Sequence, residues 1–202
     1  MDTRASVLRR LVAGLSTTVA VAAVATVLLP AAAAQADIID LSACNLSPLS
    51  QPFAPWVDPA SYELAPAGDF ENPGWTLTGG AARVPGSESF AATGELGRWS
   101  LSLPAGATAE SPATCVDAAY PTVRMFLSGT GLVAVSVVYG NLVIPAGVAV
   151  AAGGWSPSPV SLTSSAIVAL TSDGSAQVSL RLTTLLGNVH VDDVFVDPWN
   201  RG

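Results

Sequence analysis

The sequence predicts an all-β fold, a two-sheet antiparallel sandwich or a barrel, for the part of the chain after residue 67. Three observations support this prediction. The apolar residues fall in about ten short runs, and turn residues separate the runs at intervals of roughly ten residues. No stretch repeats apolar residues at helical spacing between capping residues. The 18 Gly and 15 Pro of the chain are also spaced closely enough to interrupt helices.

Alternation and turn residues define the individual strands. Val178, Leu180 and Leu182 fall on one face of their run, as a half-buried strand requires. The Ser-Gly-Thr-Gly sequence at 128–131 predicts a turn between two strands, and the Ala/Val run 146–152 fits either a strand or one helical turn. In chain order, the expected strands are 75–77, 100–103, 122–127, 132–139, 142–144, 159–162, 167–170, 176–183 and 188–196.

Residues 1–36 differ from the rest of the chain and predict a signal peptide. Three arginines precede a mainly apolar stretch, 11–29, and an Ala-rich tract ends in the small-x-small sequence Ala34-Gln35-Ala36. An apolar run of about 20 residues is also long enough to anchor a chain in a bilayer. Pro30 and the Ala tract favour cleavage over anchoring. We therefore expect an extracellular protein, free or at the cell surface, with no membrane span after cleavage.

The remaining chain is expected to form one domain and to be a monomer. Residues 37–67 are rich in Pro and polar residues and predict an extended lead-in that lies across the domain. Residues 68–202 are expected to form the β-sandwich, and a chain of this length can bury a full core.

The charge composition excludes several classes of function. Only 11% of the residues are charged, the net charge is −7, and all eight basic residues are Arg. Nucleic-acid binding is not expected, because no basic patch offers contacts to phosphates. One His and two Cys are too few for a zinc site of the usual Cys/His kinds.

The two cysteines, Cys44 and Cys115, predict one disulfide. An even number of cysteines in an exported chain indicates a disulfide, because the compartment is oxidising. Two alternatives are weaker. A nucleophilic Cys would need a nearby His, and His190 lies far along the chain, whereas free thiols would need a reducing compartment.

Two weak motifs resemble enzyme signatures, and neither makes us expect an enzyme. Gly129-Thr130-Gly131 matches part of a dinucleotide-binding loop, but strand sequence follows where that loop needs a helix. His190 with Asp192 or Asp193 offers two-thirds of a hydrolase triad, but the chain has no Gly-x-Ser-x-Gly sequence.

The two ends of the strand region resemble those of a known family. The sequence Gly68-Asp69-Phe70-Glu71-Asn72-Pro73-Gly74-Trp75 opens it, and Val191-Asp192-Asp193-Val194-Phe195-Val196-Asp197-Pro198-Trp199 closes it. These segments resemble the carbohydrate-binding, galactose-binding-like jelly rolls. The resemblance implies a jelly-roll β-sandwich whose first and last strands lie together. It also implies a structural Ca²⁺ held by Glu71 and by Asp192 or Asp193, since Ca²⁺ takes six to eight hard oxygen ligands. The alternative is that these acids accept bonds from turn amides or pair with an Arg such as Arg83.

A second resemblance covers the Cys-to-Cys frame and the Gly-Gly-Ala segment at 79–86. It is to a group of uncharacterised secreted actinobacterial proteins, and it implies export and a fold without implying a function.

Two functions follow from this sequence. The first is a non-catalytic module that binds carbohydrate or a cell-envelope glycan. Trp99, Trp155 and Trp199 are the candidate aromatic platforms, because sugar rings stack on flat aromatic faces, whereas Trp75 is expected in the core. The second is a structural or protein-interaction protein of the extracellular space with no small ligand.

Overall fold

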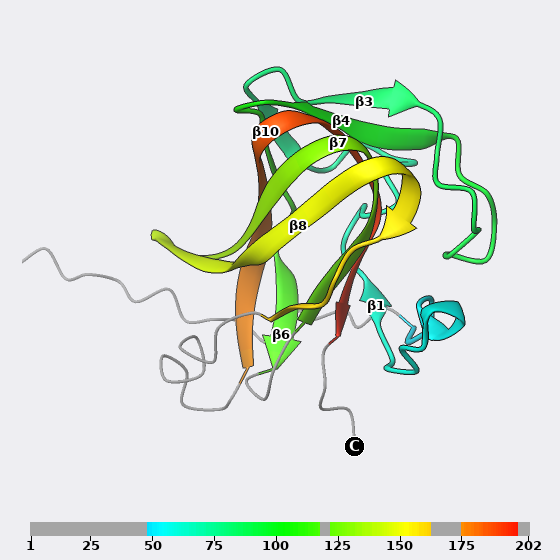
Figure 1. Ribbon diagram of the computed structural model, residues 1–202. Coiled ribbons are helices and arrows are strands. Elements are labelled where there is room, and N and C mark those ends of the chain that lie inside the picture. The colour runs from blue at the N-terminus through cyan, green and yellow to red at the C-terminus, as the bar shows by residue number, and fades with distance from the viewer. Residues whose placement is uncertain (1–47, 118–121, 163–174, 198–202) are drawn as a thin grey trace, which may run out of the picture. The chain divides into compact units, whose positions relative to one another are not determined.

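A computed structural model describes residues 48–117, 122–162 and 175–197 (Figure 1). Every pairing of strands in this part is antiparallel, which confirms the predicted antiparallel all-β fold. The elements are the 3-10 helix η2 (Ala54–Trp56) and the strands β1 (Glu63–Leu64), β2 (Thr76–Thr78), β3 (Ala82–Pro85), β4 (Trp99–Pro104), β5 (Thr108–Glu110), β6 (Thr114–Asp117), β7 (Thr122–Tyr139), β8 (Leu142–Pro157), β9 (Ser161–Leu162) and β10 (Ser175–Asp197).

Two long strands, β7 and β10, organise the sandwich. They pair with each other along almost their whole length, and Figure 1 shows them curling over together with β8. The first half of β10 pairs with β5 and β6, and its second half pairs with β4 and β1. Because the strands curl over, the two halves of the sheet face each other as the two layers of the sandwich. Each long strand therefore contributes to both layers. The main core lies between these layers, with Val178, Leu180 and Leu182 from one half of β10 and Val189 and Val191 from the other.

The turn expected at 128–131 is wrong, since β7 continues through it as one strand. The runs 176–183 and 188–196 likewise belong to the single strand β10. The reason is a close approach of backbones where both strands bend. A Cβ atom on Gly187 would lie 1.9 Å from the Thr130 carbonyl oxygen, and one on Gly131 would lie 2.1 Å from that of Leu186. These glycines permit a bend in paired strands, a role that sequence pattern does not separate from a turn.

Two shifts of register change which face of β10 each residue occupies. The first lies between Thr184 and Leu186, and the second lies between Asp192 and Phe195. Asp193 sits in the second irregularity with a φ of 45°, which is unusual for a residue other than glycine. Because of this bulge, Val194 returns to the main core although two acids precede it.

The strand expected to open the sandwich, 75–77, corresponds to β2 and is not adjacent to the last strand, because β5 lies between β2 and β10. The strand that pairs with the end of β10 is β1, with Glu63 opposite Val196. Trp75 and Val194 belong to the same core cluster, and only 9% of Trp75 is exposed. The structure thus confirms Trp75 as a core residue.

Several predictions lie outside the described residues. These are the signal peptide, Cys44 of the disulfide, the strand 167–170 and Trp199, while for Cys115 the structure describes the backbone alone. Within the described ranges, no helix has the length and apolar character needed to cross a bilayer.

The bend of β7 and β10 can be tested by adding one methyl group. We predict that Gly187→Ala lowers the free energy of unfolding by about 3 kcal/mol or more, because the new Cβ atom would overlap the backbone of Thr130. Gly106→Ala is the matched control, since Gly106 has nearly the same φ (81° against 80°) and no atom within 4 Å of its Cβ position. It should cost only about 1 kcal/mol. Equal losses for the two variants in urea unfolding would contradict the close approach.

Candidate functional site

A second hydrophobic cluster covers part of the sheet face that points away from the main core. It consists of Phe53, Tyr62, Phe126 and Phe195, which are almost completely buried. Phe53 stacks on Phe126 at 5.3 Å between ring centroids and meets Phe195 edge-on at 5.6 Å. Phe126 and Phe195 belong to β7 and β10, whereas Phe53 and Tyr62 come from the segment before β1. This cluster therefore fixes the chain around η2 onto the sheet.

An ion pair beneath η2 strengthens this attachment. The Arg124 guanidinium lies 2.5 Å from Asp58 Oδ2, 4.1 Å from the centre of the Phe53 ring, and donates to the Ser158 carbonyl. The Tyr62 hydroxyl donates to the same Asp58 oxygen at 2.8 Å. Burial opposes ionisation of Asp58, but the bonds from Tyr62 and Arg124 outweigh it and hold its pKa below the usual value. Burial, together with the Asp58 charge, raises the pKa of Tyr62 to about 12.

Three partly exposed rings lie on this cluster and form what we call the aromatic band: Trp56, Phe90 and Trp155. Trp56 meets Phe90 edge-on at 4.9 Å, and both rings contact Phe126 at 5.5 Å. Trp155 also packs against the cluster. Phe90 is 43% exposed, and the two indoles are half-buried. The band thus combines rigid support from below with aromatic surface open to solvent.

A row of polar side chains continues from Trp155 across the sheet. Ser128 lies at a shift in the register of β8 against β7, where Gly154 and Trp155 together face it. Ser128 is opposite His190 on β10, and His190 is opposite Ser102 on β4. The rings of Trp155 and His190 meet edge-on at 6.5 Å. At the usual strand separation this row is about 14 Å long, and all four side chains are partly exposed.

The other two predicted platforms are not placed in this band. Trp99 lies on the same face of β4 as Leu101 and Leu103, which point into the main core, and the Arg83 guanidinium covers its ring at 4.9 Å. Trp199 lies outside the described residues. Sequence reasoning did not identify Trp56 and Phe90, because the first lies in the Pro-rich lead-in and the second in a loop. No periodicity marks either residue.

The acids expected to hold Ca²⁺ lie near one another but have other partners. Glu71 Oε1 accepts hydrogen bonds from the backbone N–H groups of Arg98 (2.5 Å) and Trp99 (2.9 Å). Burial opposes ionisation of Glu71, yet these two bonds hold its pKa below the usual value. Arg83 donates to the carbonyl oxygens of Phe70 and Glu71. Backbone amides therefore satisfy the Glu71 carboxylate, while Arg83 binds the carbonyls beside it.

Asp192 and Asp193 are buried beside a third acid, Glu88. Asp192 accepts from the Ser87 hydroxyl (2.7 Å) and from the backbone N–H groups of Glu88 and Asp193. Burial raises the pKa of Asp192 to about 6 against these bonds. Burial also raises the pKa of Asp193 to about 8, and the charges of Asp192, Glu88 and Asp69 act in the same direction. The negative charges of these acids repel one another when all are ionised, and a bound proton or cation would reduce that repulsion.

The described residues contain no group of three or more acid, His or Cys side chains placed to hold a metal ion. Moreover, most oxygens of Glu71 and Asp192 already accept bonds from protein donors. Calcium binding stays a prediction.

Chelation tests that prediction directly. A structural Ca²⁺ at this corner would make the melting temperature fall by several degrees in EGTA, because a ligand bound to the folded state alone stabilises it. Glu71→Gln should remove this sensitivity. An unchanged melting curve would contradict a structural Ca²⁺ at this corner and would mean that hydrogen bonds and protonation alone stabilise these acids.

In calcium-free buffer we expect ionisation of Asp193 to destabilise the folded state. Its folded pKa lies above the ordinary value of 3.8, so the folded state holds a proton that the unfolded state releases. The stabilisation is complete below about pH 4 and is lost as the pH rises towards 8. We predict that Asp193→Asn raises the melting temperature at pH 8 by about 3 °C or more and flattens the pH dependence. Asn also tolerates positive φ. Glu95→Gln, at an exposed position, is the control and should leave the pH dependence unchanged.

Asp192 does not orient His190 as a hydrolase dyad would require. Both Asp192 oxygens accept bonds from Ser87, Glu88 and Asp193, and the His190 ring instead contacts Trp155. The residues of the weak enzyme motif are thus used for packing and for the buried corner.

Comparisons with known proteins concern the fold. No protein-family model matches the chain, and no curated protein matches it. Similar solved structures include the C-terminal CBM6 of the laminarinase LamC from Zobellia galactanivorans, with 11% identity, a TM-score of 0.44 and coverage of 60% of this chain and 90% of that one. The xylan-binding CBM22-1 domain of Xyn10C from Paenibacillus barcinonensis has 13% identity, a TM-score of 0.45 and coverage of 67% and 94%. The K1 cleaved adhesin domain of Lys-gingipain from Porphyromonas gingivalis has 12% identity, a TM-score of 0.44 and coverage of 65% and 96%.

Several of the similar solved structures are carbohydrate-binding modules. No match supports the resemblance to secreted actinobacterial proteins. At these identities the likeness does not extend to a shared ligand.

Proposed function

We propose that this protein is a secreted, non-catalytic module that binds a glycan through the aromatic band and the adjoining polar row. The observation that carries the proposal is the arrangement of Trp155 beside Ser128, His190 and Ser102 on one open face. An indole face supplies apolar contact for the C–H face of a sugar ring, and the hydroxyl and imidazole groups supply hydrogen bonds to its hydroxyls.

Rigidity of the band favours this function. Binding loses less conformational entropy when the contacting side chains are already held. Trp56 and Phe90 rest on Phe126, and the ion pair of Arg124 with Asp58 fixes the chain that carries Trp56. The polar row lies on paired strands rather than on loops, so its geometry is also fixed.

The distribution of cations limits the glycan to an uncharged one. Arg181 pairs with Glu110, Arg124 with Asp58, and Arg98 with Glu71, while Arg83 donates to two carbonyl oxygens. No Arg side chain among the described residues belongs to the band or the polar row. Uronate or sulfate groups would therefore find no guanidinium partner there.

Glycan binding can be tested with two tryptophan variants. We predict that Trp155→Ala weakens binding of a neutral oligosaccharide about tenfold or more, the loss expected for an aromatic hot spot. Trp99→Ala is the matched control, because Trp99 is also half-buried but belongs to the core-facing side under Arg83. It should leave affinity within about twofold. The readout is a glycan array followed by calorimetry, with circular dichroism to confirm folding. Equal losses for both variants, or no glycan bound by the unmodified protein, would contradict the proposal.

One observation favours the alternative of a protein-interaction domain. Val150, Leu132 and Leu186 form an apolar row across β8, β7 and β10, with Val150 53% and Leu186 60% exposed. Exposed apolar rows of this kind are typical of protein contacts. A null result on glycan arrays together with loss of a captured protein partner in Leu186→Ser would favour this function.

A further inference from the structure

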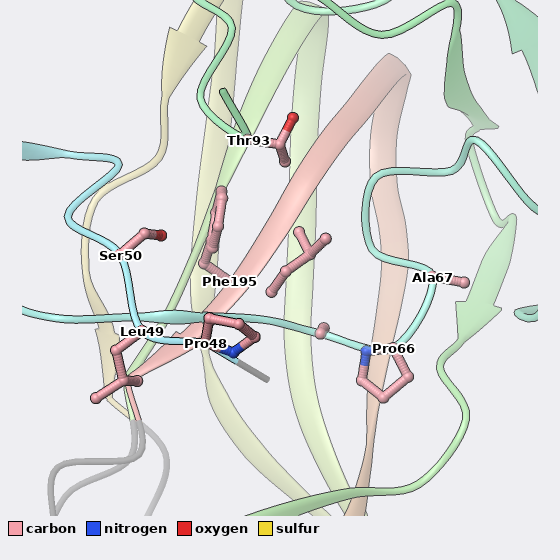
Figure 2. A pocket seen from close by; sticks show the side chains of 9 residues that line it. Pro48, Leu49, Ser50, Pro66, Ala67, Thr93 and Phe195 are labelled. Carbon is pink, nitrogen blue, oxygen red and sulfur yellow. The ribbon is translucent and has the colours of Figure 1, made fainter. Parts of the chain in front are cut away.

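A pocket of about 380 Å³ opens where the lead-in chain separates from β1 (Figure 2). It lies between two short segments of chain, with Thr93 and Phe195 completing its wall. No charged side chain lines it. The lining residues are Pro48, Leu49, Ser50, Leu64, Ala65, Pro66, Ala67, Thr93 and Phe195.

The pocket exists because strand pairing stops at a proline. Ser50 and Tyr62 exchange two backbone hydrogen bonds of 2.8 Å, so the next bonded pair in this register would join Pro48 with Leu64. Pro48 has no N–H group to donate to the Leu64 carbonyl. Pairing therefore ends, and the two segments leave a gap between them.

The backbone of Leu64 faces this gap. On β1, the Ala65 N–H donates to the Val194 carbonyl of β10. Because bonding directions alternate along a strand, the N–H and C=O groups of Leu64 point to the other side, towards Pro48. The pocket thus offers one peptide N–H and one peptide C=O at a strand edge.

The remaining lining is mainly apolar. The Thr93 hydroxyl donates to the Glu95 carbonyl and points away from the other lining residues in Figure 2, so Thr93 presents its methyl group. The Ser50 hydroxyl points towards Phe195. Pro48, Pro66 and Phe195 supply apolar walls. The matching ligand group is neutral, carries an amide N–H and C=O, and ends in a small apolar group.

We infer that this pocket binds the acetamido group of an N-acetylated hexosamine. Its amide pairs with the exposed edge of Leu64, and its methyl group contacts the apolar walls. This inference rests on the proposed function and deepens it by naming the class of sugar. Phe195 belongs to the cluster that supports the aromatic band, and Thr93 follows Phe90 by three residues. Phe195 of the cluster that supports the aromatic band therefore also forms part of the pocket wall.

The test compares two tetrasaccharides that differ only at C2. Chitotetraose and cellotetraose share the β-1,4 linkage, but only the first carries acetamido groups. We expect the full secreted chain to bind chitotetraose about tenfold more tightly by calorimetry. Ser50→Tyr, which fills the mouth of the pocket, should bring the two affinities within twofold. The control Ser61→Tyr changes an exposed residue outside the lining and should keep the preference.

The outcomes separate this inference from the proposed function. Trp155→Ala should weaken both tetrasaccharides and leave their ratio unchanged. Equal affinities for the unmodified protein, or a preference that survives in Ser50→Tyr, would overturn the acetamido pocket while glycan binding stands. Binding of neither sugar would overturn the acetamido pocket, and binding of no glycan on the array would overturn both proposals. Tighter binding of acetyl-trialanine N-methylamide than of chitotetraose, lost in Ser50→Tyr, would assign the pocket to a peptide and overturn the inference.

Discussion

The close passage of β7 and β10 at their common bend is the constraint on which the rest of this structure depends. Both strands must change direction without losing their pairing, and only glycines allow the backbones to come near enough at Gly131 and Gly187. Once the bend is made, each strand supplies side chains to the main core from two sides. The remaining strands then add to edges that these two strands already define.

The bend also decides what lies outside the main core. On the second half of β10, Val189 and Val191 point inward, so His190 and Asp192 take the opposite face. The loop around Ser87 and Glu88 covers Asp192, and the lead-in chain covers Phe126, while His190 stays at the border with solvent. On this face of β10, the boundary between the covered and the open part of the sheet therefore lies between His190 and Asp192. Trp155 and the polar row lie along this boundary, and this is why aromatic and polar groups meet there.

The acidic residues of this protein are not all on its surface, as its low content of charged residues and its negative net charge would suggest. Acids outnumber bases, yet three acids are withdrawn from solvent at the second irregularity of β10. Hydrogen bonds from Ser87 and from backbone amides stabilise the Asp192 carboxylate, whereas Asp193 is buried among the negative charges of Asp192, Glu88 and Asp69. Burial of like charges disfavours ionisation. The stability of this corner is thus linked to pH through Asp193. Glu88 also joins the corner to the aromatic band, because its carboxylate accepts a hydrogen bond from the backbone N–H of Phe90.

The sequence determined the antiparallel all-β class, most strand positions and the burial of Trp75, because alternation and turn residues act over a few positions. The resemblance to a known family, and no local pattern, implied that the two ends of the strand region meet. It did not separate a bend from a turn at 128–131, because glycine serves both and only a second strand passing within contact distance distinguishes them. It placed Glu71 and Asp192 near one another but not their partners. Those donors come from loops whose path no local pattern encodes. Trp56, Phe90 and the pocket beside Leu64 were decided by tertiary structure alone, since each depends on how the Pro-rich lead-in packs against strands that follow it by more than 60 residues.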